Sequence, residues 1–363
     1  ARVASADAAF EGFVDLEFRL AVGANQVNHR ADYRAPPIDC AIQDLMNEND
    51  WDDLDFGWSE PASLLPGHAP VMVAEVLELL EPRPGQTVLD CTVGRGGHAA
   101  AIMPRLVPGG RYIGLDADAA NVRELQEMAD ETPVPMALAH ANFVDARRVL
   151  DESGVDLVDG LLADLGFAST QMDRADRGLS FNAEGPLDMR LDQTAKVTAA
   201  ELVNEASEQE LADIIFRYGE ERASRKIARK IVEKRQEHPI KTTRELADIC
   251  SAAYGPAARR QRIDPATRTF QALRIAVNDE LGALEKLLAS LEKLVKPGGR
   301  VAVISFHSLE DRMVKQGFKA LVAAGKAKGL TRKPLVAKDA ERAANRRSRS
   351  AKLRAIELVD SDF

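Results

Sequence analysis

The segment "VLDCTVGRGGHAAAI", residues 88–102, joins an apolar strand to a cluster of glycines and a run of small residues. This order is typical of a loop that binds a nucleotide-type ligand, because glycines let the backbone approach the ligand closely. Asp90 stands four residues before Gly94, where it would repel a pyrophosphate and attract an ammonium group. The loop therefore favours a cationic ligand without phosphate.

Two further acids follow apolar segments: Asp116 comes after "YIGL" and Asp164 after "LLA". If these segments are parallel strands, the acids share the sheet edge where ligands bind. S-adenosylmethionine fits such a site, because it carries an ammonium and a sulfonium group. Asp116, 22 residues after Gly94, is placed to accept both ribose hydroxyls. A dehydrogenase that binds NAD would use such an acid equally, but it would have no acid at the end of the first strand.

The surrounding text alternates strands and helices, which predicts an α/β fold with a parallel sheet. Between residues 169 and 268 no convincing strand appears, and apolar residues recur at helical spacing. A long helix over 268–295 and the strands "RVAVIS" and "AKLRAIEL" then resume the α/β pattern. The expected strands are 87–91, 112–115, 136–139 and 157–163, and the expected helices are 71–80, 98–106, 119–129 and 144–150.

This organisation predicts one α/β domain with a helical insertion. Its first part covers residues 66–168, the insertion that recognises the substrate covers 169–268, and the second part covers 269–363. Residues 1–65 are acidic and show little periodicity, so we expect a poorly ordered extension.

The net charge of −9 lies entirely in the first 60 residues, which hold 13 acids and 4 bases. In the remainder, residues 217–262 carry 13 bases against 6 acids, and residues 311–354 carry 14 against 3. Two basic stretches indicate a surface that faces a polyanion, and two solvated helix faces are the alternative. Neither a membrane span nor a targeting signal is indicated. Three widely spaced cysteines favour neither disulfides nor zinc, so we expect a cytoplasmic protein.

Several segments, in order, closely resemble the ribosomal RNA small subunit methyltransferase H family. They are "HAPVMVAEVLELL", "DCTVGRGGH", "GLDAD", "LLADLGFAS", "RGLSFNAEGPLDMRLDQ", "YGEERASRKIARKIVE", "PATRTFQALRIAVNDEL", "PGGRVAVISFHSLEDRMVK" and "NRRSRSAKLRA". The resemblance covers about His68 to Leu358. Residues 1–65 have no counterpart in the family pattern.

The resemblance implies a Rossmann-like class I methyltransferase sheet with an inserted all-helical domain. It also implies an S-adenosylmethionine-dependent enzyme that methylates N4 of a cytidine in the decoding region of small-subunit (16S) ribosomal RNA. Small-subunit ribosomal RNA or the assembling 30S subunit is then the partner, and a homodimer stays open. The cofactor-binding residues that carry over are Gly96, Gly97, His98, Asp116, Phe143, Asp164 and Gln171. No catalytic residue is assigned.

Other interpretations concern single residues. His98 and His307 lie far apart in sequence without partners at ligand spacing, so we expect no metal. Ser305, His307 and Ser308 lack the nucleophile-elbow motif and are expected in a polar loop at the cleft. Phe216 and Tyr218 could stack on RNA bases, but aromatic residues at that spacing more often pack in a helical core, which we favour. A non-catalytic RNA-binding module is the remaining alternative.

Overall fold

A seven-stranded sheet forms the centre of the computed structural model, with strand order β3-β2-β1-β4-β5-β7-β6. The structure describes residues 64–65, 69–166, 171–172, 174–260 and 263–360. The strands from β3 to β5 pair in parallel, and β7 pairs antiparallel with both β5 and β6. The predicted Rossmann-like α/β sheet is therefore confirmed. The strands are β1 (Thr87–Asp90), β2 (Arg111–Asp116), β3 (Met136–His140), β4 (Val158–Asp164), β5 (Val295–Ser305), β6 (Ala327–Gly329) and β7 (Lys352–Leu358).

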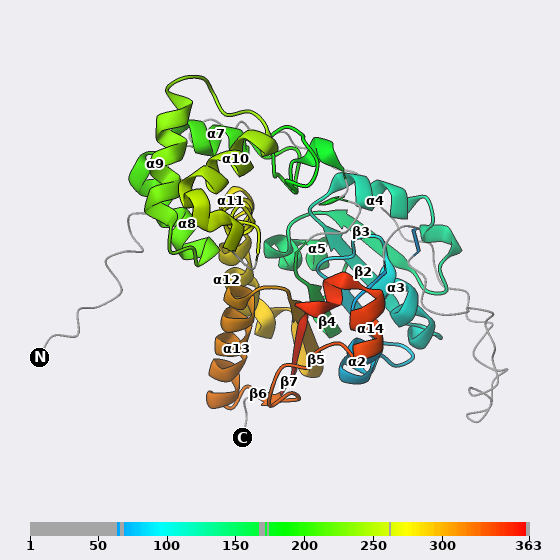
Figure 1. The fold of residues 1–363 in the computed structure, drawn as a ribbon. Coiled ribbons are helices and arrows are strands. Elements are labelled where there is room, and N and C mark those ends of the chain that lie inside the picture. Colours follow the sequence, from blue (N-terminus) through cyan, green and yellow to red (C-terminus); the bar gives the residue numbers. More distant parts are fainter. Residues whose placement is uncertain (1–63, 66–68, 167–170, 173, 261–262, 361–363) are drawn as a thin grey trace, which may run out of the picture. The chain divides into compact units, whose positions relative to one another are not determined.

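Helices cover both faces of this sheet (Figure 1). Side chains alternate between the faces along a strand, so Leu89 and Leu161 join one core and Val88 and Leu162 join the other. The central strand β4 is apolar on both sides, as expected for a buried parallel strand. The first core holds α5 (Ala146–Glu152), α12 (Glu280–Ser290) and α13 (Ser308–Ala323). The second holds α2 (Val73–Leu80), α3 (Gly97–Ile102) and α4 (Ala119–Gln126).

A separate hydrophobic cluster, formed by helices, lies between β4 and β5 in the sequence. Thr198, Ser207 and Thr242 each begin a helix with a reciprocal capping box, in which the cap side chain and a glutamate three residues later satisfy free backbone N–H groups. The described residues of this region hold no strand longer than an isolated bridge. The helices are α7 (Ala199–Glu205), α8 (Glu208–Gly219), α9 (Ser224–Arg235), α10 (Thr243–Tyr254) and α11 (Thr267–Asn278). Whether they form a separate domain stays a prediction.

The prediction of one long helix over residues 268–295 is wrong in one respect. The helix is broken at Asp279, whose φ of 47° is left-handed, so that α11 and α12 are two helices. Residues of α11, such as Phe270 and Leu273, pack in the helical cluster, whereas Leu284 and Leu287 of α12 pack on the sheet. The break therefore separates the two cores.

Two further expectations concern residues 1–65 and membrane spans. The prediction for residues 1–65 falls almost wholly outside the described residues. None of the helices in the described part combines the length and the apolar character that a membrane span requires.

Candidate functional site

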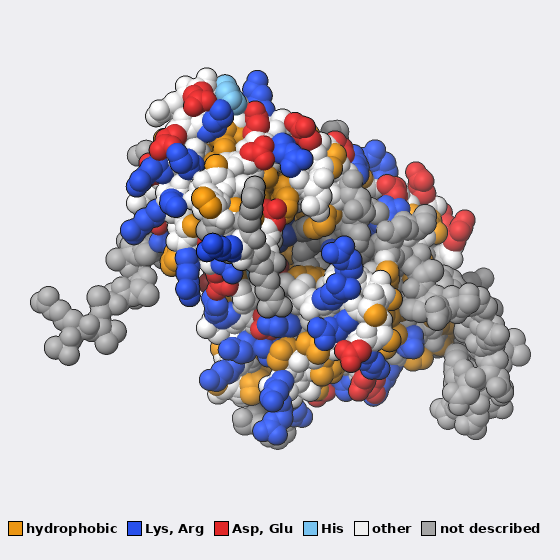
Figure 2. Space-filling model, in the orientation of Figure 1, with side chains coloured by type: hydrophobic (Ala, Val, Ile, Leu, Met, Phe, Trp, Pro, Cys, Tyr) orange, Lys and Arg blue, Asp and Glu red, His pale blue; other side chains and the backbone are white. Residues whose placement is uncertain are grey.

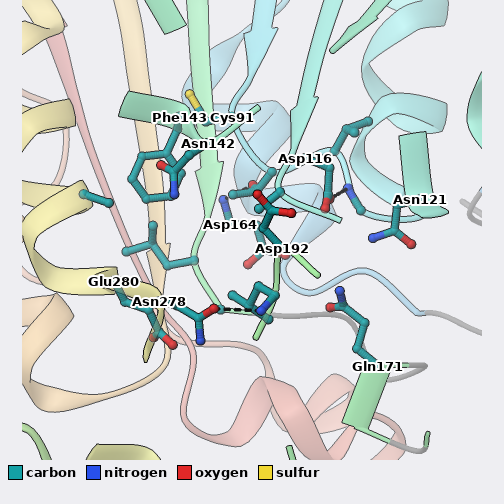
Figure 3. A pocket seen from close by; sticks show the side chains of 18 of the residues that line it. Cys91, Asp116, Asn121, Asn142, Phe143, Asp164, Gln171, Asp192, Asn278 and Glu280 are labelled. Carbon is teal, nitrogen blue, oxygen red and sulfur yellow. Dashed lines mark hydrogen bonds between the residues drawn. The ribbon is translucent and has the colours of Figure 1, made fainter. Parts of the chain in front are cut away.

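A cavity of about 330 Å³ opens at the carboxyl ends of β1, β2 and β4. Figure 3 shows Asp116 and Asn121 on one side, Asn278 and Glu280 on the other, and Asp164 between them. This edge of an open parallel sheet is where ligands bind, and the volume is in the range of small-molecule sites. The cavity is therefore the candidate functional site.

The strand register decides which acids reach this cavity. Asp90 is paired with Gly114 of β2 and with Leu162 of β4. Asp116 and Asp164 thus stand two residues further along their strands, about 6.6 Å beyond the level of Asp90. Both line the cavity, whereas Asp90 does not. The expectation that Asp90 faces a cationic ligand is therefore wrong.

Asp90 is instead buried at the start of the glycine loop, where it accepts hydrogen bonds. It is 1% exposed and accepts hydrogen bonds from the Tyr112 hydroxyl (2.6 Å) and the Thr92 N–H (2.9 Å). The Thr92 hydroxyl in turn accepts a hydrogen bond from the Asp164 N–H (2.7 Å). Burial raises the pKa of Asp90 above its ordinary value. The acid therefore ties the ends of β1 and β4 together.

Asp116 is held in place by two backbone donors and by the Asn121 side chain. Its Oδ2 accepts from the Gly94 N–H (2.8 Å) and its Oδ1 from the Asp118 N–H (2.7 Å). Each carboxylate oxygen can accept a second hydrogen bond, because it has two lone pairs. Burial outweighs these donors and raises the pKa of Asp116 to about 6. The carboxylate is thus ionised near neutral pH and suits a ligand with two neighbouring hydroxyl groups.

His98 and Asp164 form a buried pair beside the glycine loop. His98 Nε2 lies 3.5 Å from Asp164 Oδ2, and the His98 side chain is 7% exposed. Among the described residues, neither ring nitrogen of His98 has a hydrogen-bond partner. Asp164 Oδ1 also has none among these residues. Burial opposes the charged imidazole, but Asp164 and Asp90 outweigh it and raise the pKa of His98. Buried polar atoms of this kind require a partner, so the pair points to a polar ligand.

Asp118 binds two side chains of the segment that follows β4. Its Oδ2 accepts from Gln171 Nε2 (2.7 Å) and from Arg177 Nη1 (2.6 Å). The Arg177 side chain is 3% exposed, and its Nη2 donates to the carbonyl oxygens of Arg190 (3.0 Å) and Leu191 (2.8 Å). Burial opposes ionisation of Asp118, but Gln171 and Arg177 outweigh it and lower its pKa. The buried guanidinium therefore joins α4 to the chain that leads into the helical cluster.

The opposite wall of the cavity comes from the break between α11 and α12. Asn278 Oδ1 accepts from the Leu191 N–H (2.7 Å), and its Nδ2 donates to the Met189 carbonyl oxygen (2.8 Å). Glu280 accepts two hydrogen bonds from the Arg274 guanidinium (2.7 and 2.8 Å). This wall is therefore fixed by contacts on both sides of the helix break.

His307 has acidic neighbours, contrary to the expectation from its spacing. Ligand atoms of Glu280, His307 and Glu310 lie within 4.8 Å of one another, close enough to hold a metal ion. However, the Arg274 guanidinium already donates hydrogen bonds to the Glu280 carboxylate. His307 Nδ1 accepts from the Glu310 N–H (3.3 Å) and so caps the helix. A metal at Nε2 would require a proton on Nδ1 and would break that cap. The absence of a metal stays a prediction.

Six of the seven predicted binding residues line this one cavity. These are Gly97, His98, Asp116, Phe143, Asp164 and Gln171. Gly96 does not line it, but it precedes α3 with a φ of 74°, and a Cβ there would meet Leu64. Sequence reasoning missed Asp118, Arg177, Asn278 and Glu280. The motifs "RGLSF" and "AVNDEL" contain Arg177, Asn278 and Glu280, but nothing in their spacing indicates a contact with the strand ends.

Basic side chains gather on the surface of the helical cluster. Figure 2 shows Lys and Arg side chains over α8 and α9, with hydrophobic side chains exposed among them. Tyr218 packs against the helical cluster, as favoured. Phe216 is 58% exposed, so the interpretation of it as a core residue is wrong.

The family model and the similar sequences agree on one family. The model of the MraW methylase family matches residues 66–359. The ribosomal RNA small subunit methyltransferase H of Geobacter sulfurreducens is 50% identical over 312 residues, covering 80% of this chain and 99% of that protein. The enzyme of the same name from Symbiobacterium thermophilum is 48% identical over 304 residues, covering 80% and 96%. Among solved structures, Aeropyrum pernix fibrillarin with S-adenosyl-L-methionine aligns at 11% identity and a TM-score of 0.34, covering 76% of this chain and 67% of that one.

Proposed function

Because the chain belongs to the MraW methylase family, we propose that it methylates the exocyclic N4 of a cytidine in the decoding region of small-subunit ribosomal RNA. It is a methyltransferase of small-subunit ribosomal RNA that uses S-adenosylmethionine. The family membership carries this function. The position of the methyl group and the roles of single residues are our proposal.

The residues of the cavity fit S-adenosylmethionine. We assign the ribose hydroxyls to Asp116, whose carboxylate accepts from two backbone N–H groups and also from the Asn121 side chain, which a ribose hydroxyl would replace. The adenine lies against Phe143, which lines the cavity and packs on the core. The ammonium and carboxylate groups of the methionine part meet Asp164 and His98, whose buried atoms otherwise lack hydrogen bonds. Gly97 and Gln171 complete the cavity lining around it.

Bound S-adenosylmethionine supplies an electrophilic methyl group on its sulfonium. The chain must take the cytosine out of any stack and hold N4 in line with that methyl, because the amine lone pair is delocalised into the ring. The wall of Asn278 and Glu280 stands across the cavity from Asp116 (Figure 3). Its rigid hydrogen bonding suits a surface that orients the base. Phe306 and Leu284 add apolar lining that excludes water.

The basic surfaces are suited to ribosomal RNA. Arg222, Arg225, Arg229 and Lys230 are exposed around α9, and Arg346 and Arg349 are exposed near the cavity residue Arg347. Phosphate contacts release counterions, so RNA affinity is expected to fall steeply with salt, whereas S-adenosylmethionine affinity changes little.

The decisive assay is transfer of labelled methyl to small-subunit RNA, followed by nucleoside analysis. Naked RNA and the assembling 30S subunit are offered in parallel, because either is a candidate substrate. We expect label on N4 of cytidine. Label on a cytosine carbon, on another base or only on protein would refute the assignment.

A charge variant tests the RNA surface separately. Neutralising Arg225, Arg229 and Lys230 together is expected to flatten the salt dependence of RNA binding and to slow methylation, with S-adenosylmethionine affinity unchanged. Sedimentation of the wild-type protein, with and without RNA, tests the homodimer that sequence analysis leaves open.

A further inference from the structure

Phe216 lies on the solvent side of α8, although it is a large aromatic residue. Its neighbours Ile214 and Ile215 are buried in the helical cluster, as an amphipathic helix requires. Phe216 is 58% exposed, more than any other large hydrophobic residue in the described part of the chain. The ring is therefore available to a partner.

Cations without ion pairs surround the end of α8. Arg217, Arg222, Arg225 and Lys226 are all exposed, and no described acid lies within ion-pair distance of them. Further along α9 the cations are paired, for example Lys230 with Glu233 (2.6 Å) and Lys234 with Glu237 (2.7 Å). The four unpaired cations thus lie between the last turn of α8 and the first turn of α9, and Figure 2 shows Lys and Arg side chains over these two helices. We call Phe216 and these four cations the α8–α9 patch.

The patch is connected to the rim of the cavity. Glu220, which follows α8, accepts hydrogen bonds from the Ser308 hydroxyl and from Arg312 Nη2 (2.8 Å) at the start of α13. Ser308 stands two residues after Phe306, which lines the cavity. The end of α8 is therefore in contact with the segment that begins at the rim of the cavity.

We propose that the α8–α9 patch binds an unpaired nucleobase of the substrate RNA next to the target nucleotide, with the base stacked on Phe216 and its phosphates held by the four cations. This inference rests on the proposed function. Unpaired RNA bases are recognised by stacking on exposed aromatic rings, and grooves for single strands add cations that follow the backbone. A second copy of the chain is a poor occupant, because a two-fold contact would place the four cations opposite their own copies.

The test compares variants at a position where loss of the side chain leaves no cavity. F216A is expected to weaken binding of a single-stranded fragment of small-subunit RNA by about tenfold, within the range for one stacked base. F216L should be nearly as weak, and F216W should bind like wild type, because only an aromatic ring stacks. V336A, at another exposed hydrophobic residue (56%), is the matched control and should not change affinity. Thermal melting verifies that each variant folds.

Two readouts separate stacking from other roles. The salt dependence of RNA binding should keep its slope in F216A, because no phosphate contact is lost, whereas R225A should lower it. The fluorescence of F216W, corrected for Trp51 and Trp58 with the wild-type protein, should be quenched by RNA and less so by RNA with an abasic site beside the target. Unchanged RNA affinity in F216A overturns the proposal.

Other occupants have their own signatures. Emission of F216W, corrected for Trp51 and Trp58, that rises when residues 1–60 are deleted, without RNA, would identify that acidic segment as the occupant and overturn the proposal. A change of sedimentation in F216A would identify a second copy and also overturn it. Wild-type methyl transfer is measured first: if no RNA is methylated, the proposed function fails, whereas normal transfer by both wild type and F216A refutes the stacking site alone.

Discussion

Asp116 predicts a pH dependence of cofactor binding with a definite sign. Burial raises its pKa to about 6 in the protein without ligand, from an ordinary value of 3.8. Ionising this carboxyl in the folded chain therefore costs about 3 kcal/mol relative to the unfolded chain. Because the folded pKa is the higher one, the folding stability that Asp116 contributes is greatest below about pH 4 and is lost as the pH rises to 6. The ionised form is nevertheless the better acceptor for two ribose hydroxyls.

The size of the effect follows from the fraction of ionised carboxylate. At pH 7 about nine tenths of Asp116 is ionised, and at pH 5 about one tenth. If only the ionised form binds well, S-adenosylmethionine affinity falls about tenfold between these values. His98 also has a raised pKa, but its protonation at low pH favours the carboxylate of the ligand and so acts in the opposite direction.

Calorimetric titration from pH 5 to pH 7 measures this, since the amino group of the ligand stays charged over that range. D116N removes the titrating group. Its affinity at pH 7 should be at least tenfold lower, and it should not weaken further at pH 5. Equal wild-type affinity at both pH values, or the same loss of affinity in D116N, would show that Asp116 is not the group responsible.

Three further outcomes are expected. Arg177→Met removes the guanidinium of a buried ion pair and should cost about 3–5 kcal/mol in denaturant unfolding; a loss below 1 kcal/mol contradicts the clamp. Gly178→Ala should lower the melting temperature markedly, because its Cβ would overlap the Pro186 carbonyl oxygen, whereas Gly85→Ala, also at positive φ but in open space, should cost much less. Deleting residues 1–60 should leave methyl transfer largely intact, since the family match begins at residue 66; loss of folding would show that the segment is integral.

The strands and the acids at their ends could be predicted because each signal is local. An apolar run followed by an acid marks a buried strand that ends at a polar edge, and this placed Asp116 and Asp164 correctly. The same pattern misplaced Asp90, because its position depends on register. Only the pairing of Asp90 with Gly114 shows that β1 ends two residues short of the rim. Register is a property of the sheet and is not carried by the strand itself.

The wall opposite these acids could not be predicted, because tertiary contacts override local preference there. "AVNDEL" contains neither glycine nor proline, and its apolar spacing continues as a helix. Asp279 nevertheless adopts a left-handed conformation. Asn278 holds the break through hydrogen bonds to Met189 and Leu191, almost ninety residues earlier in the chain. The break thus forms without glycine or proline, because contacts from outside the helix stabilise it.

One chain of buried and partly buried hydrogen bonds connects the two sides of the cavity. Arg177 binds Asp118 and, at the same time, the carbonyl oxygen of Leu191, and the Leu191 N–H binds Asn278. Asp118 in turn donates its own N–H to Asp116. Moving the wall at Asn278 away from Asp116 must therefore break one of these hydrogen bonds or carry the whole segment with it, and breaking the ion pair of Arg177 with Asp118 would cost several kcal/mol. The side proposed for the cofactor and the side proposed for the base are thus joined by continuous contacts, which favour the alignment that transfer between two groups requires.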